Sequence, residues 1–189
     1  MEKHDLKEIE VKIKVDDFGK IEEELLKLNC KLSDPVTQID KIYLPNGIKF
    51  TEIKTDTNIL RIRRQNDKNI FTLKRNSETS LSKIEYETVF ENAEQMEKIF
   101  DTLNFYQAAS VKKTRRKCKY NDMEICLDDV EGLGKYIEIE KMTSDDPQKT
   151  QKELLEVLES LDVNTNNRAY YGYDILIYLK DHPEDTNKF

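Results

Sequence analysis

Several segments of this chain alternate strictly between charged and apolar residues, and this alternation limits the folds that the chain can adopt. In residues 6–15, Glu8, Glu10 and Lys12 alternate with apolar side chains. Because successive side chains of a strand point to opposite faces of a sheet, this segment is predicted to be a strand with one charged and one apolar face. Further strands are predicted at residues 30–44, 59–64, 70–75, 83–90, 110–120, 123–130 and 135–142.

Three segments with helical spacing interrupt the strands. Helices are predicted from Asp16-Asp17 to about Cys30, at residues 92–103 and at residues 146–161, each with apolar residues on one face. No repeat or linker divides the chain, so a single domain is predicted over residues 1–180, with a polar, disordered tail at residues 181–189. Many strands with few helices between them favour an antiparallel sheet that is closed, or nearly closed, into a barrel.

The charged faces of the predicted strands carry both signs. The acids are Glu8, Glu10, Glu85, Glu87, Asp128, Glu138 and Glu140, and the bases are Lys12, Arg61, Arg63, Lys74, Lys113 and Arg115. For any single strand, a solvated outer face is the simpler interpretation. For the whole set, the intervening positions are strongly apolar, and three amphipathic helices are available to cover them. If the helices cover the apolar faces, the charged faces point inward.

A set of inward-facing charges would be costly to remove from water unless it held ions, water or a ligand. Carboxylates bind hard divalent cations, which prefer oxygen ligands. Lys and Arg bind phosphate oxygens through charge-assisted hydrogen bonds. Acids for a metal together with bases for phosphate are what metal-assisted phosphoryl chemistry requires. The pattern therefore indicates a small polyanion held in a defined pocket.

Composition narrows the choice of partners. The net charge is −7 and the isoelectric point is about 5.1, whereas nucleic-acid binders normally carry a basic surface. The basic runs at residues 61–64 and 112–117 are therefore interpreted as local exceptions. The three cysteines show no metal-ligand or redox spacing, and the longest apolar stretch, at residues 175–179, is too short to span a bilayer. We expect a cytoplasmic protein that binds neither nucleic acid nor a membrane.

The order of these residues resembles the CYTH family, which groups class IV adenylate cyclases with thiamine and inorganic triphosphatases. Residues 8–12 read Glu-Ile-Glu-Val-Lys and match the family's ExExK hallmark. Matching blocks follow in the family's order at residues 38–45, 60–63, 71–74, 85–87, 113–115 and 127–140. The last block contains Glu131-Gly132-Leu133-Gly134 and is most similar to the cyclase branch. The resemblance covers about residues 6–178.

The resemblance implies an α+β fold in which an eight-stranded antiparallel sheet forms a closed β-barrel, the triphosphate tunnel, with helices packed on the outside. It also implies dependence on Mg²⁺ or Mn²⁺. Carried over position by position, the triphosphate-binding residues would be Lys12, Arg61, Arg63, Lys74, Lys113 and Arg115. The metal ligands would be Glu10, Asp128, Glu138 and Glu140. The catalytic set would be Glu8, Glu10, Lys12 and Glu87, while Glu85 could either position a neighbouring base or bind metal.

The expected function is that of a class IV adenylate cyclase, which converts ATP into cyclic AMP and pyrophosphate. One alternative is a triphosphatase that hydrolyses thiamine triphosphate or inorganic tripolyphosphate. Another is a nucleotide- or polyphosphate-binding module without turnover. In each case the expected partner is a nucleoside triphosphate or another triphosphate, and the rim of an open barrel could also support a homodimer.

Overall fold

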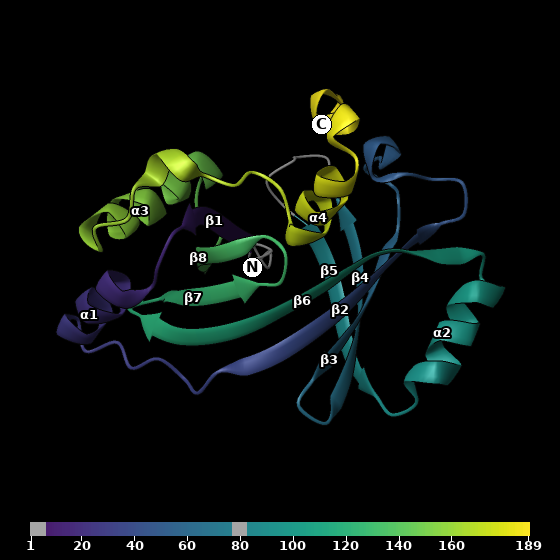
Figure 1. Ribbon diagram of the computed structural model, residues 1–189, viewed down its shortest axis with the longest axis horizontal. Coiled ribbons are helices and arrows are strands. Elements are labelled where there is room, and N and C mark those ends of the chain that lie inside the picture. Colours follow the sequence, from purple (N-terminus) through teal and green to yellow (C-terminus); the bar gives the residue numbers. More distant parts are fainter. Residues whose placement is uncertain (1–6, 77–82) are drawn as a thin grey trace, which may run out of the picture. The chain divides into compact units, whose positions relative to one another are not determined.

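The computed structural model describes residues 7–76 and 83–189 of the chain. Residue contacts divide the chain into two compact units. Unit 1 comprises residues 1–35 and 114–170, and unit 2 comprises residues 36–113 and 171–189. Figure 1 labels the helices and strands that make up both units.

Eight strands form one hydrogen-bonded sheet in the order β1-β8-β7-β6-β2-β3-β4-β5. They are β1 (Lys7–Val15), β2 (Val36–Pro45), β3 (Ile59–Gln65), β4 (Lys68–Asn76), β5 (Lys83–Phe90), β6 (Phe105–Tyr120), β7 (Met123–Val130) and β8 (Gly134–Thr143). The α+β class and the eight-stranded antiparallel sheet are confirmed.

The predicted closure of the sheet into a barrel is not confirmed. Within the described residues, β1 and β5 are the two ends of the strand order, so the hydrogen-bonded ladder has two edges. The physical reason is that an alternating pattern assigns the two faces of each strand but does not specify whether two edge strands pair with each other. Three strands also start at least two residues from the predicted position, including β4, which begins at Lys68 rather than at residue 70. β2 begins at Val36 rather than at residue 30, and β6 begins at Phe105 rather than at residue 110.

Four α-helices lie in the described residues: α1 (Gly19–Lys27), α2 (Ala93–Thr102), α3 (Pro147–Ser160) and α4 (Tyr173–Asp181). The first three were predicted. The side chain of Asn92 accepts a hydrogen bond from the first turn of α2, and Asp146 does the same for α3. α1 instead begins after Phe18 without a side-chain cap, so it starts later than predicted and neither Asp16 nor Asp17 caps it. None of the described helices combines the length and the apolar character needed to cross a membrane.

The C-terminal segment is more structured than its polar composition indicated. α4 was not predicted, and the segment that was expected to be a disordered tail contains the short 3-10 helix η3 (Pro183–Lys188). Tyr178 of α4 contributes to the order of this segment, because its ring packs against Phe50 and its hydroxyl donates a hydrogen bond to Asp185.

In unit 1, helices cover the apolar face of β1 and β8. α3 contacts both strands, and its Leu154 and Leu158 share one buried cluster with Val11 and Ile139. Residues of α1 complete this cluster. Since side chains alternate along a strand, covering this face directs the charged positions of β1 and β8 to the other face.

In unit 2, α2 covers the apolar face of β2, β3 and β4. Its Phe100 is buried in a cluster with Tyr43, Leu60 and Ile62. The Phe100 ring lies 5.0 Å from the ring of Tyr43 and 5.4 Å from that of Phe71, measured between centroids. The predicted arrangement, in which amphipathic helices cover the apolar faces of the strands, is therefore found within each unit.

The buried α3 interface leads to a prediction about stability. Replacing the fully buried Leu158 by Ala should lower the free energy of unfolding by about 2–5 kcal/mol, because the change removes apolar contacts and leaves a cavity. Lys152→Ala, an exposed position on the same helix, should change it by less than about 0.5 kcal/mol. Urea denaturation followed by circular dichroism measures both. Equal denaturation midpoints for Leu158→Ala and the parent protein would contradict the packing.

Candidate functional site

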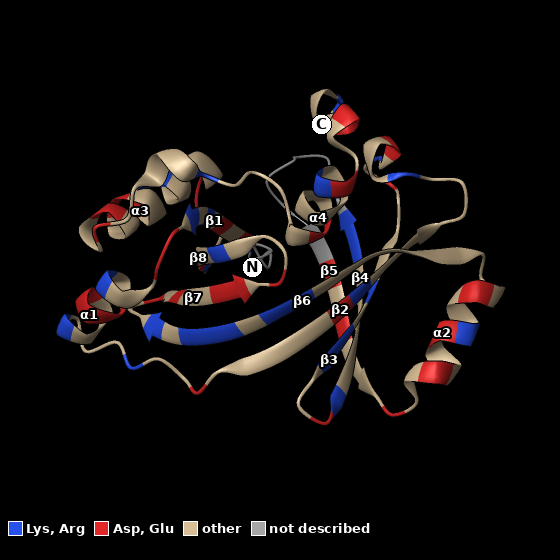
Figure 2. Ribbon diagram, in the orientation of Figure 1, with Lys and Arg blue, Asp and Glu red and all other residues tan. Residues whose placement is uncertain are grey.

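The charged face of unit 1 is organised in rows across β1, β8 and β7. Residues directly opposite each other in an antiparallel pair lie on the same face. One row places Glu10 opposite Glu140, which is opposite Glu124. The next row places Lys12 opposite Glu138, which is opposite Cys126. Figure 2 shows the charges along these strands and the run of Lys and Arg along β6.

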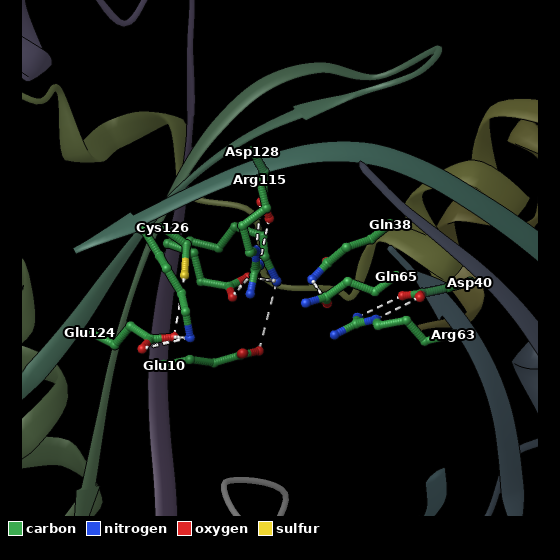
Figure 3. A network of polar contacts seen from close by, with 12 residues as sticks. Glu10, Gln38, Asp40, Arg63, Gln65, Arg115, Glu124, Cys126 and Asp128 are labelled. Atoms are coloured by element: carbon green, nitrogen blue, oxygen red, sulfur yellow. Dashed lines mark hydrogen bonds and ion pairs between the residues drawn. The ribbon is translucent and has the colours of Figure 1, made fainter. Parts of the chain in front are cut away.

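A buried ion-pair network holds the centre of this face. Arg115 donates two hydrogen bonds to Asp128, from Nε to Oδ1 at 2.7 Å and from Nη2 to Oδ2 at 2.5 Å. The same Nη2 lies 2.8 Å from Oε1 of Glu138, and Lys12 Nζ lies 3.1 Å from the other oxygen of Glu138. Asp128 is 0% exposed, and Lys12 and Glu138 are 6% and 5% exposed. Figure 3 shows Arg115 against Asp128.

The burial of these charges decides between two interpretations of the pattern. Lys12, Asp128 and Glu138 are buried, so this face of unit 1 is not a solvated outer surface. Burial by itself lowers the pKa of Lys12, but the carboxylates of Glu138 and Glu10 outweigh it and raise the pKa above its ordinary value. Lys12 is therefore a stable cation within an acidic environment.

Glu140 lies in the most crowded acidic part of this face. Burial raises the pKa of its carboxyl group, and the nearby carboxylates of Glu8, Glu138 and Glu124 raise it further, to about 7. Like charges in a partly buried place disfavour ionisation of each carboxyl. A cation placed beside Glu140 would reverse this effect.

The predicted metal ligands have suitable donor atoms, but they are not arranged as a preformed coordination site. Their donors are all carboxylate oxygens, which suit Mg²⁺ or Mn²⁺, and burial together with three nearby carboxylates raises the pKa of Glu140. In the part of the chain that the structure describes, however, no group of three or more His, Cys, Asp or Glu is positioned to hold a metal ion. Asp128 differs from Glu140 because both of its oxygens are bound by Arg115.

The charged face of unit 2 is also organised in rows, now across β2, β3, β4 and β5. One row contains Asp40, Arg63, Ile70 and Val89 in turn. The next row contains Ile42, Arg61, Thr72 and Glu87, and the row after it contains Ile59, Lys74 and Glu85. Three of the predicted phosphate-binding bases therefore occupy successive rows of one face.

Carboxylates hold each of these three bases in place. Arg63 binds Asp40 through two hydrogen bonds of 2.7 Å. Lys74 Nζ lies 2.7 Å from Glu85 Oε1, which agrees with a positioning role for Glu85. The Arg61 pair is longer, with Nη2 lying 3.4 Å from Oε2 of Glu87.

Arg61 is the least compensated of the three bases. Burial lowers its pKa, and the neighbouring guanidinium of Arg63 lowers it further. Two guanidinium groups thus lie close together on a face where Thr72 accepts a hydrogen bond of 3.0 Å from Arg61. Lys113, also in unit 2, is buried, and its ammonium group lies 4.8 Å from the ring centre of Tyr173.

Some residues of these networks were not among the predicted site residues. Asp40 was part of a matched sequence block, and its parity could have placed it on the same face of β2 as Gln38 and Ile42, but its pairing with Arg63 depends on the register of β2 against β3. Burial raises the pKa of an isolated carboxyl, yet Arg63 and two further cations lower the pKa of Asp40 below its ordinary value. Tyr173 carried no such signal, because its contact with Lys113 depends on α4, which was not predicted.

The predicted residues thus form two clusters, one in each unit. The cluster of unit 1 contains Glu8, Glu10, Lys12, Arg115, Asp128, Glu138 and Glu140, and the cluster of unit 2 contains Arg61, Arg63, Lys74, Glu85, Glu87 and Lys113. Acids predominate in the first cluster and bases in the second. A face rich in carboxylates can hold divalent cations, and a face with adjacent guanidinium groups can bind phosphate oxygens.

The raised pKa of Glu140 leads to a prediction about pH. The folded pKa of about 7 lies above the ordinary value of 4.5. Between these two values the folded protein keeps a proton that the unfolded chain releases, so this carboxyl lowers stability as the pH rises from about 4.5 to 7. Without metal, Glu140→Gln should therefore raise the melting temperature more at pH 8 than at pH 4.5. The exposed Glu23→Gln is the control. An equal change at both pH values for Glu140→Gln would contradict the raised pKa of this carboxyl group.

Comparison with known proteins gives consistent matches over nearly the whole chain. The model of the CYTH domain matches residues 6–173. A Methanocaldococcus jannaschii protein named as a candidate adenylate cyclase is 37% identical over 170 residues, which cover 88% of this chain and 95% of that protein.

Solved structures show the same fold. A Pyrococcus horikoshii protein is 26% identical with a TM-score of 0.74, and the match covers 89% of this chain and 98% of that one. A candidate adenylyl cyclase from Hippeastrum, described as having a dominant triphosphatase activity, is 16% identical with a TM-score of 0.58 over 88% of this chain and 91% of that one. The family match spans most of the sequence and a relative of similar length shares more than a third of its residues, so this chain belongs to the CYTH family.

Proposed function

We propose that this protein is a divalent-metal-dependent adenylate cyclase that converts ATP into cyclic AMP and pyrophosphate. The observation that carries this proposal is the occurrence of Lys74, Arg61 and Arg63 in successive rows on the charged face of unit 2, where Arg63 lies close enough to lower the pKa of Arg61. Such a face gains most by binding a polyanion. Membership of the CYTH family and the likeness to the Methanocaldococcus protein support ATP as that polyanion.

The bases of unit 2 have the chemistry needed to bind a chain of phosphates. Planar guanidinium groups form paired hydrogen bonds to phosphate oxygens, and lysines add point charges. Because Asp40 and Glu85 already fix Arg63 and Lys74, less side-chain freedom is lost when a ligand binds. Lys12 and Arg115 supply two further cations in unit 1.

The carboxylates of unit 1 would hold the metal. Glu10, Glu138 and Glu140 lie in adjacent rows of one face, and the acidic crowding around Glu140 favours a cation there. A bound Mg²⁺ or Mn²⁺ supplies positive charge that stabilises negative charge on phosphate oxygens. Asp128 would act through Arg115, since both of its oxygens are engaged by that side chain.

A second candidate function is hydrolysis of a triphosphate. The Hippeastrum protein, which has the same fold, is described as having a dominant triphosphatase activity. Cyclisation and hydrolysis need the same phosphate-binding charges and differ in the phosphorus atom attacked and in the recognition of the base. Binding without turnover is the third possibility, and it would leave the acidic cluster of unit 1 without a catalytic use.

Product analysis separates these functions. The purified protein is incubated with Mg²⁺ or Mn²⁺ and with ATP, tripolyphosphate or thiamine triphosphate, and the products are separated by chromatography. We expect cyclic AMP and pyrophosphate from ATP. Orthophosphate from any substrate would support the triphosphatase instead. Binding of triphosphate with no product under any condition would rule out both enzymes.

Two neighbouring arginines test the phosphate-binding face. Arg63 lies on the charged face, whereas the exposed Arg64 points to the opposite face of β3. Arg63→Ala should weaken ATP binding by about 10- to 100-fold, because a charge-assisted hydrogen bond is lost. Arg64→Ala should change the dissociation constant by less than about twofold, as expected for a residue remote from the ligand. Calorimetric titration measures both constants, and circular dichroism checks folding. Equal effects of the two variants would place the phosphate elsewhere.

A further inference from the structure

A pair of glutamines lies on the charged face of unit 2 beyond the last arginine. Gln38 of β2 is directly opposite Gln65 of β3, one row along from Asp40 and Arg63. Nε2 of Gln38 donates a hydrogen bond of 2.7 Å to Oε1 of Gln65. Figure 3 shows this pair beside the pair of Arg63 and Asp40.

Gln38 is buried, with 5% of its surface exposed, but its side-chain amide does not make all the hydrogen bonds that it can form. Its carbonyl oxygen Oε1 is buried and has no hydrogen-bond partner among the described residues. A buried carbonyl without a partner is costly, so such a group normally meets water or a ligand. Its amide nitrogen carries two hydrogens, and the bond to Gln65 uses one of them. The side chain can therefore accept one hydrogen bond and donate another.

This combination of acceptor and donor matches adenine better than guanine. The 6-amino group of adenine donates a hydrogen bond, and the adjacent ring nitrogen accepts one, which is the pattern that a Gln side chain recognises. The corresponding edge of guanine offers two acceptors. Inorganic tripolyphosphate has no group that could satisfy this amide in the same way.

The spacing of the rows suits a nucleoside attached to a bound triphosphate. Successive rows on one face of a strand are two residues apart, which is about 7 Å. Lys74, Arg61 and Arg63 occupy three successive rows, and Gln38 occupies the next. A phosphate bound at Arg63 would thus leave one row for the ribose and the base.

We propose that Gln38, supported by Gln65, recognises the adenine base and makes the protein selective for adenine nucleotides over inorganic triphosphates. The proposal rests on the proposed function, because it requires a triphosphate on the neighbouring arginines. Gln38 is then a specificity-determining residue of the same face.

Calorimetric titration with three ligands tests the proposal. The ligands are ATP, purine riboside triphosphate, which lacks the 6-amino group, and inorganic tripolyphosphate, with Ca²⁺ in place of Mg²⁺ to slow turnover. The parent protein should bind ATP about tenfold more tightly than purine riboside triphosphate, because the latter leaves Oε1 of Gln38 unsatisfied. Gln38→Leu should weaken ATP binding by about tenfold and leave tripolyphosphate within about twofold. Thr37→Val, an exposed position on the other face of β2, is the matched control.

The outcomes separate this inference from the proposed function. If the parent protein binds ATP and tripolyphosphate but does not distinguish ATP from purine riboside triphosphate, the inference is wrong and the proposed function stands. Equal weakening of ATP and tripolyphosphate by Gln38→Leu would also overturn it, since Gln38 would then support the phosphate site. If the parent protein binds none of the three ligands, the proposed function itself fails. The comparison of ligands on the parent protein decides the matter even if Gln38→Leu does not fold.

Discussion

Compensation of buried charge is the constraint on which the rest of unit 1 depends. An unpaired carboxylate as deeply buried as Asp128 would be strongly destabilising, and Arg115 removes that cost by binding both of its oxygens. The pairing of Lys12 with Glu138 depends in turn on the register of β1 against β8. A shift of one residue would move these charges to the apolar face. Register and charge pairing therefore stabilise each other.

In unit 2 the charges are compensated less completely than in unit 1. Arg63 is fully paired with Asp40, while Arg61 has a longer and weaker contact with Glu87. Burial and the nearness of Arg63 leave Arg61 with a lowered pKa. In the proposed function, a bound polyanion would supply the negative charge that these carboxylates do not. This residual positive charge, rather than the fold, is the observation on which the proposed phosphate binding rests.

Alternation in the sequence was sufficient to predict which residues share a face. The side on which Glu10 and Lys12, or Arg61 and Arg63, lie is a local property of an extended chain. Two of the predicted strands, β5 and β7, also have the observed bounds. The caps of α2 and α3 were predictable for the same reason, since Asn92 and Asp146 act on their own first turns. α4 was missed because it lies in a segment rich in tyrosine, where a helical pattern is weak.

The sequence by itself therefore determined the strands, the apolar faces that the helices cover, and the set of acids and bases opposite them, because these depend on neighbours along the chain. Only the tertiary structure decided how those charges are used. It assigned Asp40 to Arg63 and Asp128 to Arg115, gathered acids around Glu140, and left the ends of the sheet unpaired with each other within the described residues. These outcomes depend on register and burial between segments far apart in the chain, and no local pattern contains that information.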